Sequence, residues 1–140
     1  MNKNNFKLKK VTEYDVQFLY ELLLERDPNS NISHKHMPSF LQHKKFIKTK
    51  PYSYWYVIIF NNKKIGSIYL TKINEIGLHM KKDFESKELE KTILKVLFEK
   101  HPKKRFLVNV NPKNKKRIHF LKHNGFNLIQ HTYELRMNME

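Results

Sequence analysis

The chain contains no cysteine and only three glycines among its 140 residues. The absence of cysteine excludes disulfide bonds, zinc sites built on thiolates and a cysteine nucleophile. No apolar run approaches the roughly 20 residues of a membrane-spanning helix, and the polar start at residues 1–5 does not have the pattern of a signal peptide. We therefore expect a cytoplasmic protein.

Acidic residues are also scarce: 13 Asp and Glu stand against 28 Lys and Arg, which gives a formal net charge of +15. A surface of this kind attracts polyanions, whether nucleic acid, acidic lipid or a phosphate-rich small molecule such as a nucleotide or coenzyme A. The basic residues are spread along the whole chain and form no clustered stripe with interleaved aromatic residues, the usual footprint of a nucleic-acid-binding protein. We therefore take the charge as mainly compositional: it favours an anionic ligand without choosing one.

Apolar periodicity divides the first half of the chain into strands and helices. Residues 6–11 alternate apolar and basic side chains, as in a half-buried strand. Thr12 opens a capping-box-like start for a helix to about residue 26, with apolar residues at i, i+3, i+4 and i+7. After an irregular segment we expect a second helix over 39–48, a β-prone strand over 54–60 and a returning hairpin strand over 65–70.

The second half predicts a further strand over 75–80, a helix over 86–101 that Pro102 stops, and an apolar strand over 106–110. A helix over 114–124, ended by Gly125, and a final strand over 126–136 complete the chain. The order β-α-α-β-β-β-α-β-α-β mixes an antiparallel meander with two β-α-β crossovers around one sheet, which is α/β or α+β by class. We expect one domain over residues 1–140, as a monomer or as a homodimer formed through the exposed edge of the final strand.

The most informative segment is the turn Asn111-Pro-Lys-Asn114, which follows an apolar strand and opens a short basic helix closed by Gly125-Phe126. A turn that presents an Asn side chain and free backbone groups at a strand end is where α/β folds bind ligands. Together with the element order, this segment resembles the GNAT family of acetyl-CoA-dependent N-acetyltransferases over nearly the whole chain. The resemblance implies transfer of an acetyl group from acetyl-CoA to an amine, without a metal.

In that family a glycine-rich loop between a strand and a helix binds the pyrophosphate of coenzyme A through backbone amides and the helix N-terminus. The corresponding residues 80–91 contain no glycine here, and Glu85 stands where the family has Arg or Gln. The chain thus departs from the motif, with nearby lysines as partial compensation. The resemblance assigns coenzyme contacts to Leu78, Met80, Lys82, Ser86, Lys87, Lys91, Asn111, Asn114 and Phe120.

The resemblance places the general base at Glu75, because attack on a thioester requires a neutral amine. The alternative is an edge-strand carboxylate with no catalytic role. A bulge near Gly77 would expose backbone amides for the thioester carbonyl, with Leu78 and Met80 as the oxyanion and pantetheine contacts. The family's Tyr that protonates the departing thiolate would fall at Leu121, which cannot donate a proton. The general acid is therefore open between a neighbouring Tyr, a Lys and water.

An aromatic and His-rich segment between the first two helices and the following strand is where this fold usually shapes its substrate pocket. The candidate acceptor residues are His34, His36, Met37, His43, Tyr52 and Trp55. The run is similar to acetyltransferases of bacterial surface-sugar biosynthesis, which acetylate amino groups of nucleotide-linked sugars. A metal at the two histidines is not supported, because no third ligand stands at suitable spacing. The competing hypothesis is a GNAT-fold module that has lost catalysis and binds a partner or a polyanion such as nucleic acid.

Overall fold

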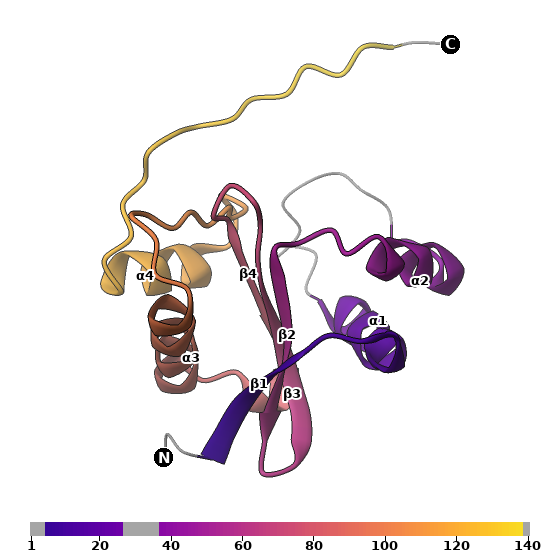
Figure 1. Cartoon of the computed structure of the whole chain (residues 1–140). Coiled ribbons are helices and arrows are strands. Elements are labelled where there is room, and N and C mark those ends of the chain that lie inside the picture. Colours follow the sequence, from indigo (N-terminus) through magenta and orange to yellow (C-terminus); the bar gives the residue numbers. More distant parts are fainter. Residues whose placement is uncertain (1–4, 27–36, 139–140) are drawn as a thin grey trace.

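The computed structural model describes residues 5–26 and 37–138, which form an antiparallel sheet with helices on both faces (Figure 1). The sheet contains β1 (Phe6–Lys10), β2 (Tyr54–Phe60), β3 (Lys63–Leu70) and β4 (Ile76–Met80), which lie side by side in sequence order. Helices α1 (Val16–Glu25) and α2 (Phe40–Lys48) cover one face, and α3 (Lys87–Lys100) and α4 (Lys115–His123) cover the other. The predicted α+β class is confirmed.

Side-chain alternation along the strands decides which helices each strand residue meets. Tyr56, Ile68 and Leu70 point toward α3 and α4 and belong to the main core cluster, together with Leu89 and Ile93. The opposite face carries Trp55, which packs on a smaller cluster formed by α1 and α2. From Ser67 onward, residues of β3 and β4 that share the parity of Tyr69 therefore face α1 and α2, and this face becomes important for the site. Before Ser67 the alternation changes at the irregularity between Ile58 and Ile59, and Ile65 belongs to the main core.

Helix caps and turn residues begin or end most helices and strands at or near the residues predicted from the sequence. The Ser39 hydroxyl accepts a hydrogen bond from the Gln42 amide as the cap of α2, and Ser86 caps α3 in the same way. Asn61 and Asn62 both have positive φ, 50° and 64°, which is the requirement of a tight two-residue hairpin turn. The returning strand therefore begins at Lys63, two residues earlier than expected.

The two C-terminal strands predicted over 106–110 and 126–136 are wrong. Only Leu107 pairs with the sheet, through one parallel bridge to Glu75. Residues 127–138 have no regular structure and project from the end of α4 (Figure 1). Both segments carry a strand-like apolar pattern, but a strand requires a neighbour that satisfies its backbone groups. The described residues supply that neighbour at Leu107 alone, so the order becomes β-α-α-β-β-β-α-α.

A buried carboxylate ties the first strand to the third. Asp15 is fully buried, and its carboxylate accepts hydrogen bonds from the Thr12 amide at 2.8 Å, from Lys64 Nζ at 2.9 Å and from Lys9 Nζ at 3.2 Å. Burial opposes ionisation of this group, but the three hydrogen bonds outweigh burial and hold the pKa of Asp15 below its ordinary value. The predicted capping box at Thr12 is present, and its acid is Asp15.

We expect Asp15→Asn to lower the free energy of unfolding at pH 7 by about 1–3 kcal/mol, because both lysines lose a charged, buried acceptor. Since the folded pKa of Asp15 is depressed, this stabilisation is complete above the ordinary value of 3.8 and is lost as the pH falls below it. Urea unfolding at pH 7 and pH 3 measures both effects. Glu13→Gln, an exposed neighbour in the same turn, is the control, and an equal loss in this variant would contradict the assignment.

Candidate active site

Strand β4 leads into α3, whose first turn is linked to the first turn of α4 by an ion pair. Its last residue, Met80, leads through a short 3-10 turn (Lys82–Phe84) into α3. Arg117 in the first turn of α4 donates from Nη1 to Glu90 Oε1 at 2.6 Å, which holds the two helix starts against each other. The positive ends of both helix dipoles are therefore close together, an arrangement that stabilises a bound anion.

The edge of β4 presents backbone donors next to these helix starts. The Ile76 amide points away from β3 and donates to the Leu107 carbonyl at 2.8 Å. By strand alternation the amides of Leu78 and Met80 point to the same edge. The described residues supply no partner for either of them, because the segment after Leu107 makes no further bridge to β4. The structure thus leaves two parallel N–H groups open at this edge.

The predicted bulge near Gly77 is absent. Tyr69 pairs with Gly77 and Ser67 with His79 in an uninterrupted register between β3 and β4; the irregularity in this sheet lies between Ile58 and Ile59. A bulge is not needed to expose amides, because β4 is already the edge strand. The open donors arise from the divergence of residues 108–110 from β4.

Glu75 stands at the head of β4, at the point where the two segments diverge. Its Oε2 accepts a hydrogen bond from Asn109 Nδ2 at 2.6 Å, and Thr71 Oγ1 lies 3.5 Å from Oε1. The backbone of Glu75 is fixed by Thr71 on one side and by the bridge to Leu107 on the other. The side chain is partly buried. It is therefore a carboxylate held in position by neutral hydrogen-bond partners.

An aromatic wall covers the neighbouring part of the sheet. The Tyr69 ring lies directly over Gly77, where any Cβ would clash with it, so this position requires glycine. Tyr52 stacks on Tyr69 with ring centroids 3.8 Å apart, and Trp55 meets Tyr52 edge-on at 4.8 Å. Trp55 Nε1 also donates to Ser67 Oγ at 2.8 Å. By alternation Glu75 lies on this same face of β4.

Three ionisable side chains of this face, His79, Tyr52 and Tyr69, are held neutral. Burial lowers the pKa of His79 to about 3, and the cations Arg26 and Arg117 act in the same direction. Burial raises the pKa of Tyr52 and of Tyr69. At neutral pH these three side chains are therefore an uncharged imidazole and two protonated phenols, and the Arg26 guanidinium acts on all three.

The residues predicted to contact coenzyme A lie around the end of β4 and the starts of α3 and α4. The hydroxyl of Ser86 and the side chain of Asn114 cap α3 and α4 by accepting from the amides of Leu89 and Arg117. Asn111 Oδ1 accepts from the Lys113 amide. Phe120 is 4% exposed and belongs to the main core, and Leu78 and Met80 pack against that core. The exposed members are Lys82, Lys87 and Lys91.

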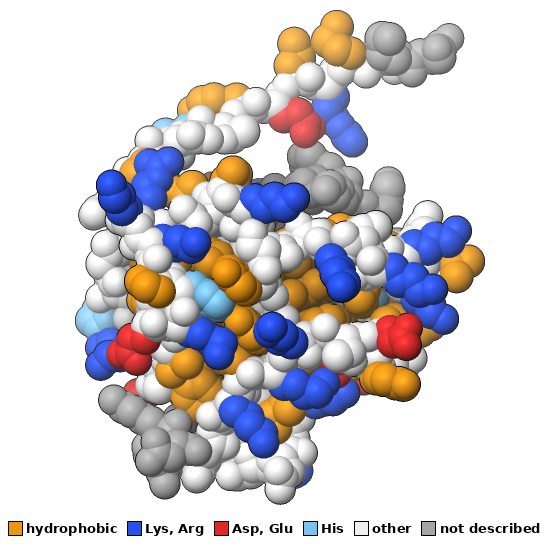
Figure 2. Space-filling model, in the orientation of Figure 1, with side chains coloured by type: hydrophobic (Ala, Val, Ile, Leu, Met, Phe, Trp, Pro, Cys, Tyr) orange, Lys and Arg blue, Asp and Glu red, His pale blue; other side chains and the backbone are white. Residues whose placement is uncertain are grey.

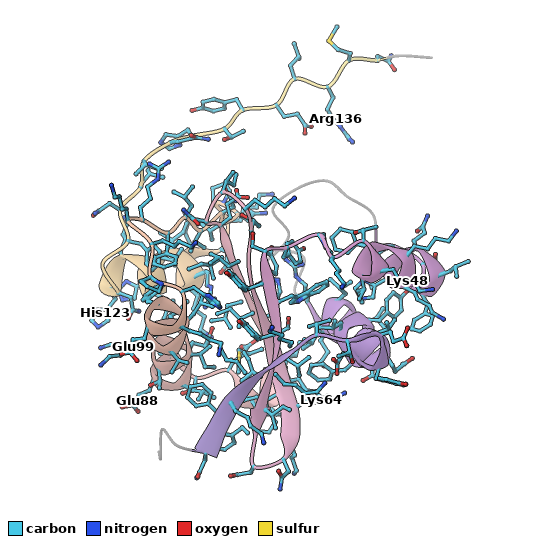
Figure 3. All side chains as sticks on the ribbon, in the orientation of Figure 1. Lys48, Lys64, Glu88, Glu99, His123 and Arg136 are labelled. Carbon is cyan, nitrogen blue, oxygen red and sulfur yellow. The ribbon has the colours of Figure 1, made fainter. Side chains whose placement is uncertain are left out.

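The glutamates of α3 do not crowd this region with free negative charge. Glu90 is 9% exposed and is neutralised by Arg117. Glu88 is exposed and points outward from α3, as Glu99 does further along the helix (Figure 3). The amides of Lys87 and Glu88 are in the first turn, where no intrahelical partner exists. These amides and the nearby lysines are donors for phosphate groups even though the segment has no glycine.

The predicted acceptor residues are only partly brought together. His34 and His36 lie outside the described residues. Met37 is 43% exposed before the start of α2, and His43 is buried beside Tyr20 of α1, with its Nε2 unpartnered among the described residues. Tyr52 and Trp55, in contrast, join the aromatic wall next to Gly77. The structure therefore gathers these two and places His43 between α1 and α2.

Sequence reasoning missed four residues of the site: Tyr69, His79, Asn109 and Arg117. Alternation carried a usable signal for Tyr69, because it has the parity opposite to the core residues Ile68 and Leu70. The same parity rule applies to His79 against Leu78 and Met80. Asn109 and Arg117 had no comparable signal, since their partners are 34 and 27 residues away in the chain.

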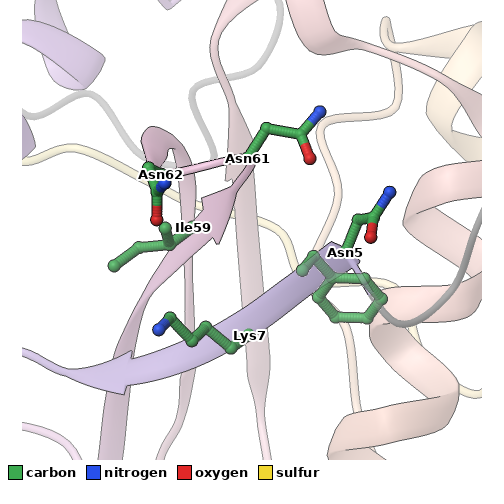
Figure 4. Close-up of a pocket in the computed structure, with 6 residues that line it drawn as sticks. Asn5, Lys7, Ile59, Asn61 and Asn62 are labelled. Carbon is green, nitrogen blue, oxygen red and sulfur yellow. The ribbon is translucent and has the colours of Figure 1, made fainter.

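A separate hollow of about 310 Å³ lies near the β2–β3 turn and the start of β1 (Figure 4). It is lined by Asn5, Phe6, Lys7, Ile59, Asn61 and Asn62. This lining has neither a carboxylate nor a histidine that could accept a proton, so we place the candidate active site at β4.

Among the described residues, no three His, Asp or Glu side chains are grouped to hold a metal. None of the described helices is long and apolar enough to cross a membrane.

Solved structures of N-acetyltransferases share this fold. A dodecameric structure of spermidine N-acetyltransferase from Vibrio cholerae matches with a TM-score of 0.73 and 17% identity, covering 96% of this chain and 87% of that one. The ribosomal L7/L12 alpha-N-protein acetyltransferase RimL, in complex with coenzyme A, matches with a TM-score of 0.68 and 17% identity over 90% and 82% of the two chains.

An acetyltransferase from Salmonella typhimurium that modifies the N-terminal serine of ribosomal protein L7/L12 has 19% identity and a TM-score of 0.68, over 87% of this chain and 80% of that one. Neither a scan against protein-family models nor a comparison with curated proteins gave a match. At these identities the likeness establishes the fold, and it confirms the acetyltransferase fold expected from the element order.

The lowered pKa of His79 predicts how stability depends on pH. Below its ordinary pKa of 6.5 the unfolded chain binds a proton at this residue that the folded chain does not bind until about pH 3. The free energy of unfolding should therefore fall with decreasing pH between these values, by up to about 1.4 kcal/mol per pH unit for this one group.

His79→Gln should reduce that slope in urea titrations between pH 6.5 and 4. The slope should not vanish, because burial lowers the pKa of His43 and of His101 as well. His119→Gln, at an exposed position on α4, is the matched control and should keep the original slope. An unchanged slope in His79→Gln would contradict a neutral, partly buried imidazole at this position.

Proposed function

We propose that this protein is an N-acetyltransferase that moves an acetyl group from acetyl-CoA to the amine of a small acceptor. The observation that carries the proposal is the pair of open amides, Leu78 and Met80, at the edge of β4. They lie between a positioned carboxylate, Glu75, and the converging starts of α3 and α4. Carbonyl-binding amides, a base and an anion site are the three elements that acyl transfer from a thioester requires.

In the proposed reaction the amine nitrogen attacks the thioester carbonyl carbon and forms the new C–N bond. The Leu78 amide donates to the carbonyl oxygen as negative charge develops there. Glu75, directly or through an ordered water, accepts the proton that the amine loses, and the C–S bond breaks to release the coenzyme thiolate. Leu121 is buried in the core and has no proton to give. The phenol of Tyr69, protonated and lying over Gly77, is our candidate for returning a proton to the sulfur.

Coenzyme binding is proposed at the start of α3. The amides of Lys87 and Glu88 would donate to the pyrophosphate, with Lys82, Lys87 and Lys91 supplying positive charge. The Met80 amide would hold the pantetheine arm in the manner of an added strand. In this arrangement backbone donors and lysines replace the glycine loop, and Arg117 removes the opposing charge of Glu90.

For the acceptor we propose a nucleotide-linked amino sugar. The enzymes of similar fold act on spermidine and on the N-terminal serine of a ribosomal protein. A polycation such as spermidine is repelled by a chain of net charge +15. Lys and Arg are spread over the face shown in Figure 2, where acidic side chains are few. An acceptor that combines an amine with phosphates suits that charge. It also suits the aromatic wall of Tyr52, Trp55 and Tyr69, on which a base or sugar can stack.

Binding of acetyl-CoA is tested by thermal shift. At a concentration about 100 times its dissociation constant the ligand should stabilise the fold by about 2.7 kcal/mol, which raises the melting temperature by several degrees for a domain of this size. Free CoA should act similarly, and ATP controls for charge alone. No shift, or one shared by ATP that disappears at high salt, would contradict the proposal and favour a polyanion-binding module.

Catalysis is tested by Glu75→Gln, which keeps an oxygen for the Asn109 hydrogen bond but removes the base. With a panel of a nucleotide-linked amino sugar, spermidine and an N-terminal peptide as acceptors, we expect kcat for the productive acceptor to fall about 100- to 10,000-fold. The acetyl-CoA thermal shift should be unchanged. Glu99→Gln, the same change on the outer surface of α3, should keep full activity. An active Glu75→Gln enzyme would show that this carboxylate is not the base.

A further inference from the structure

The C-terminal segment, residues 126–138, has the pattern of a strand but no surface to pack on. From residue 129 onward every second position is apolar except His131: Ile129, Tyr133, Leu135 and Met137 are 67%, 91%, 84% and 70% exposed. The intervening positions are Gln130, Thr132, Glu134, Arg136 and Asn138. Such alternation is the signature of a half-buried strand. An apolar row of this length exposed to water indicates a binding surface.

The same chain offers a free strand edge at residues 106–110. The Leu107 carbonyl accepts from the Ile76 amide of β4, and its N–H donates to the carbonyl of Asn74, just before β4, both at 2.8 Å. By alternation the backbone groups of Phe106 and Val108 point to the opposite side, where the described residues provide no partner. The side chains of Phe106, Val108 and Val110 pack against the main core. The edge is therefore anchored, extended and open to pairing.

We propose that residues 126–138 of one copy add as a strand to the 106–110 edge of a second copy, in a reciprocal exchange that forms a homodimer. Each chain carries one donor strand and one acceptor edge, so a two-fold arrangement satisfies both at once. After Gly125 the chain is held at Phe126, whose amide donates to the Leu121 carbonyl at 2.9 Å, and it then leads away from its own body (Figure 1).

Charge favours a second copy of this chain over a polyanion as the occupant. Within residues 126–138 the charged side chains are Glu134 and Arg136, which form an ion pair at 3.3 Å. The segment is thus neutral, in a chain whose net charge is +15, and it can approach a basic copy without repulsion while offering nothing to phosphates. The accepting segment carries Asn109, the hydrogen-bond partner of Glu75, so the exchanged strand would lie beside the candidate active site.

The first test is mass in solution, measured by light scattering. The unmodified chain should have twice its own 17.1 kDa. Tyr133→Lys with Leu135→Lys should raise the dimer dissociation constant by roughly 100-fold or more, because two buried apolar side chains are lost. Gln130→Lys with Thr132→Lys adds the same charge on the polar face and should remain dimeric. A monomeric unmodified chain, or a dimer that the first pair does not weaken, would overturn the proposal.

The second test separates exchange from a strand that folds back on its own chain. Because the chain has no cysteine, Arg105→Cys and Thr132→Cys allow clean spin labelling at two exposed positions. A mixture of the two singly labelled chains should give a short inter-label distance. A doubly labelled chain diluted in a large excess of unlabelled chain should give none. A short distance in the diluted sample would place the strand on its own chain and overturn the exchange.

Discussion

One backbone pairing, between Glu75 and Leu107, sets the geometry on which the candidate site depends. It brings residues 106–110 beside β4 and places Asn109 within hydrogen-bond distance of the Glu75 carboxylate. Because the pairing does not continue, the amides of Leu78 and Met80 remain available at the strand edge. A longer parallel ladder would have consumed these donors, and no pairing at all would have left Glu75 without its partner.

One face of the sheet forms the main core, and the other carries the aromatic wall of the candidate site. Side chains of one parity, such as Ile68 and Leu78, pack against α3 and α4. Side chains of the other parity, such as Tyr69 and His79, form the wall next to Glu75. Gly77 lets the Tyr69 ring lie flat on β4, where any larger residue would displace it. The protein thus maintains its core with half of each strand and presents aromatic and ionisable groups with the other half.

The two buried carboxylates in the described part of the chain are both paired with basic side chains. Asp15 accepts from two lysines, and Glu90 accepts from Arg117. The second pair has a consequence for the site, because it joins the starts of α3 and α4 and removes an acidic charge from the region proposed for phosphates. Most lysines cannot have such a partner, because acidic residues are fewer than half as many as basic ones.

Sequence alone determined the features that depend on near neighbours. The caps at Thr12, Ser39 and Ser86, the Asn61-Asn62 turn and the helix stop at Gly125 all follow from residue chemistry within a few positions. The resemblance to acetyltransferases pointed to Glu75, Leu78 and Met80 as candidate site residues. Tertiary structure alone decided that residues 106–110 pair only at Leu107, that Asn109 meets Glu75 and that Arg117 meets Glu90. An alternating apolar pattern shows that a segment can form a strand. Whether it pairs depends on a neighbouring strand, which comes from elsewhere in the chain or from another chain.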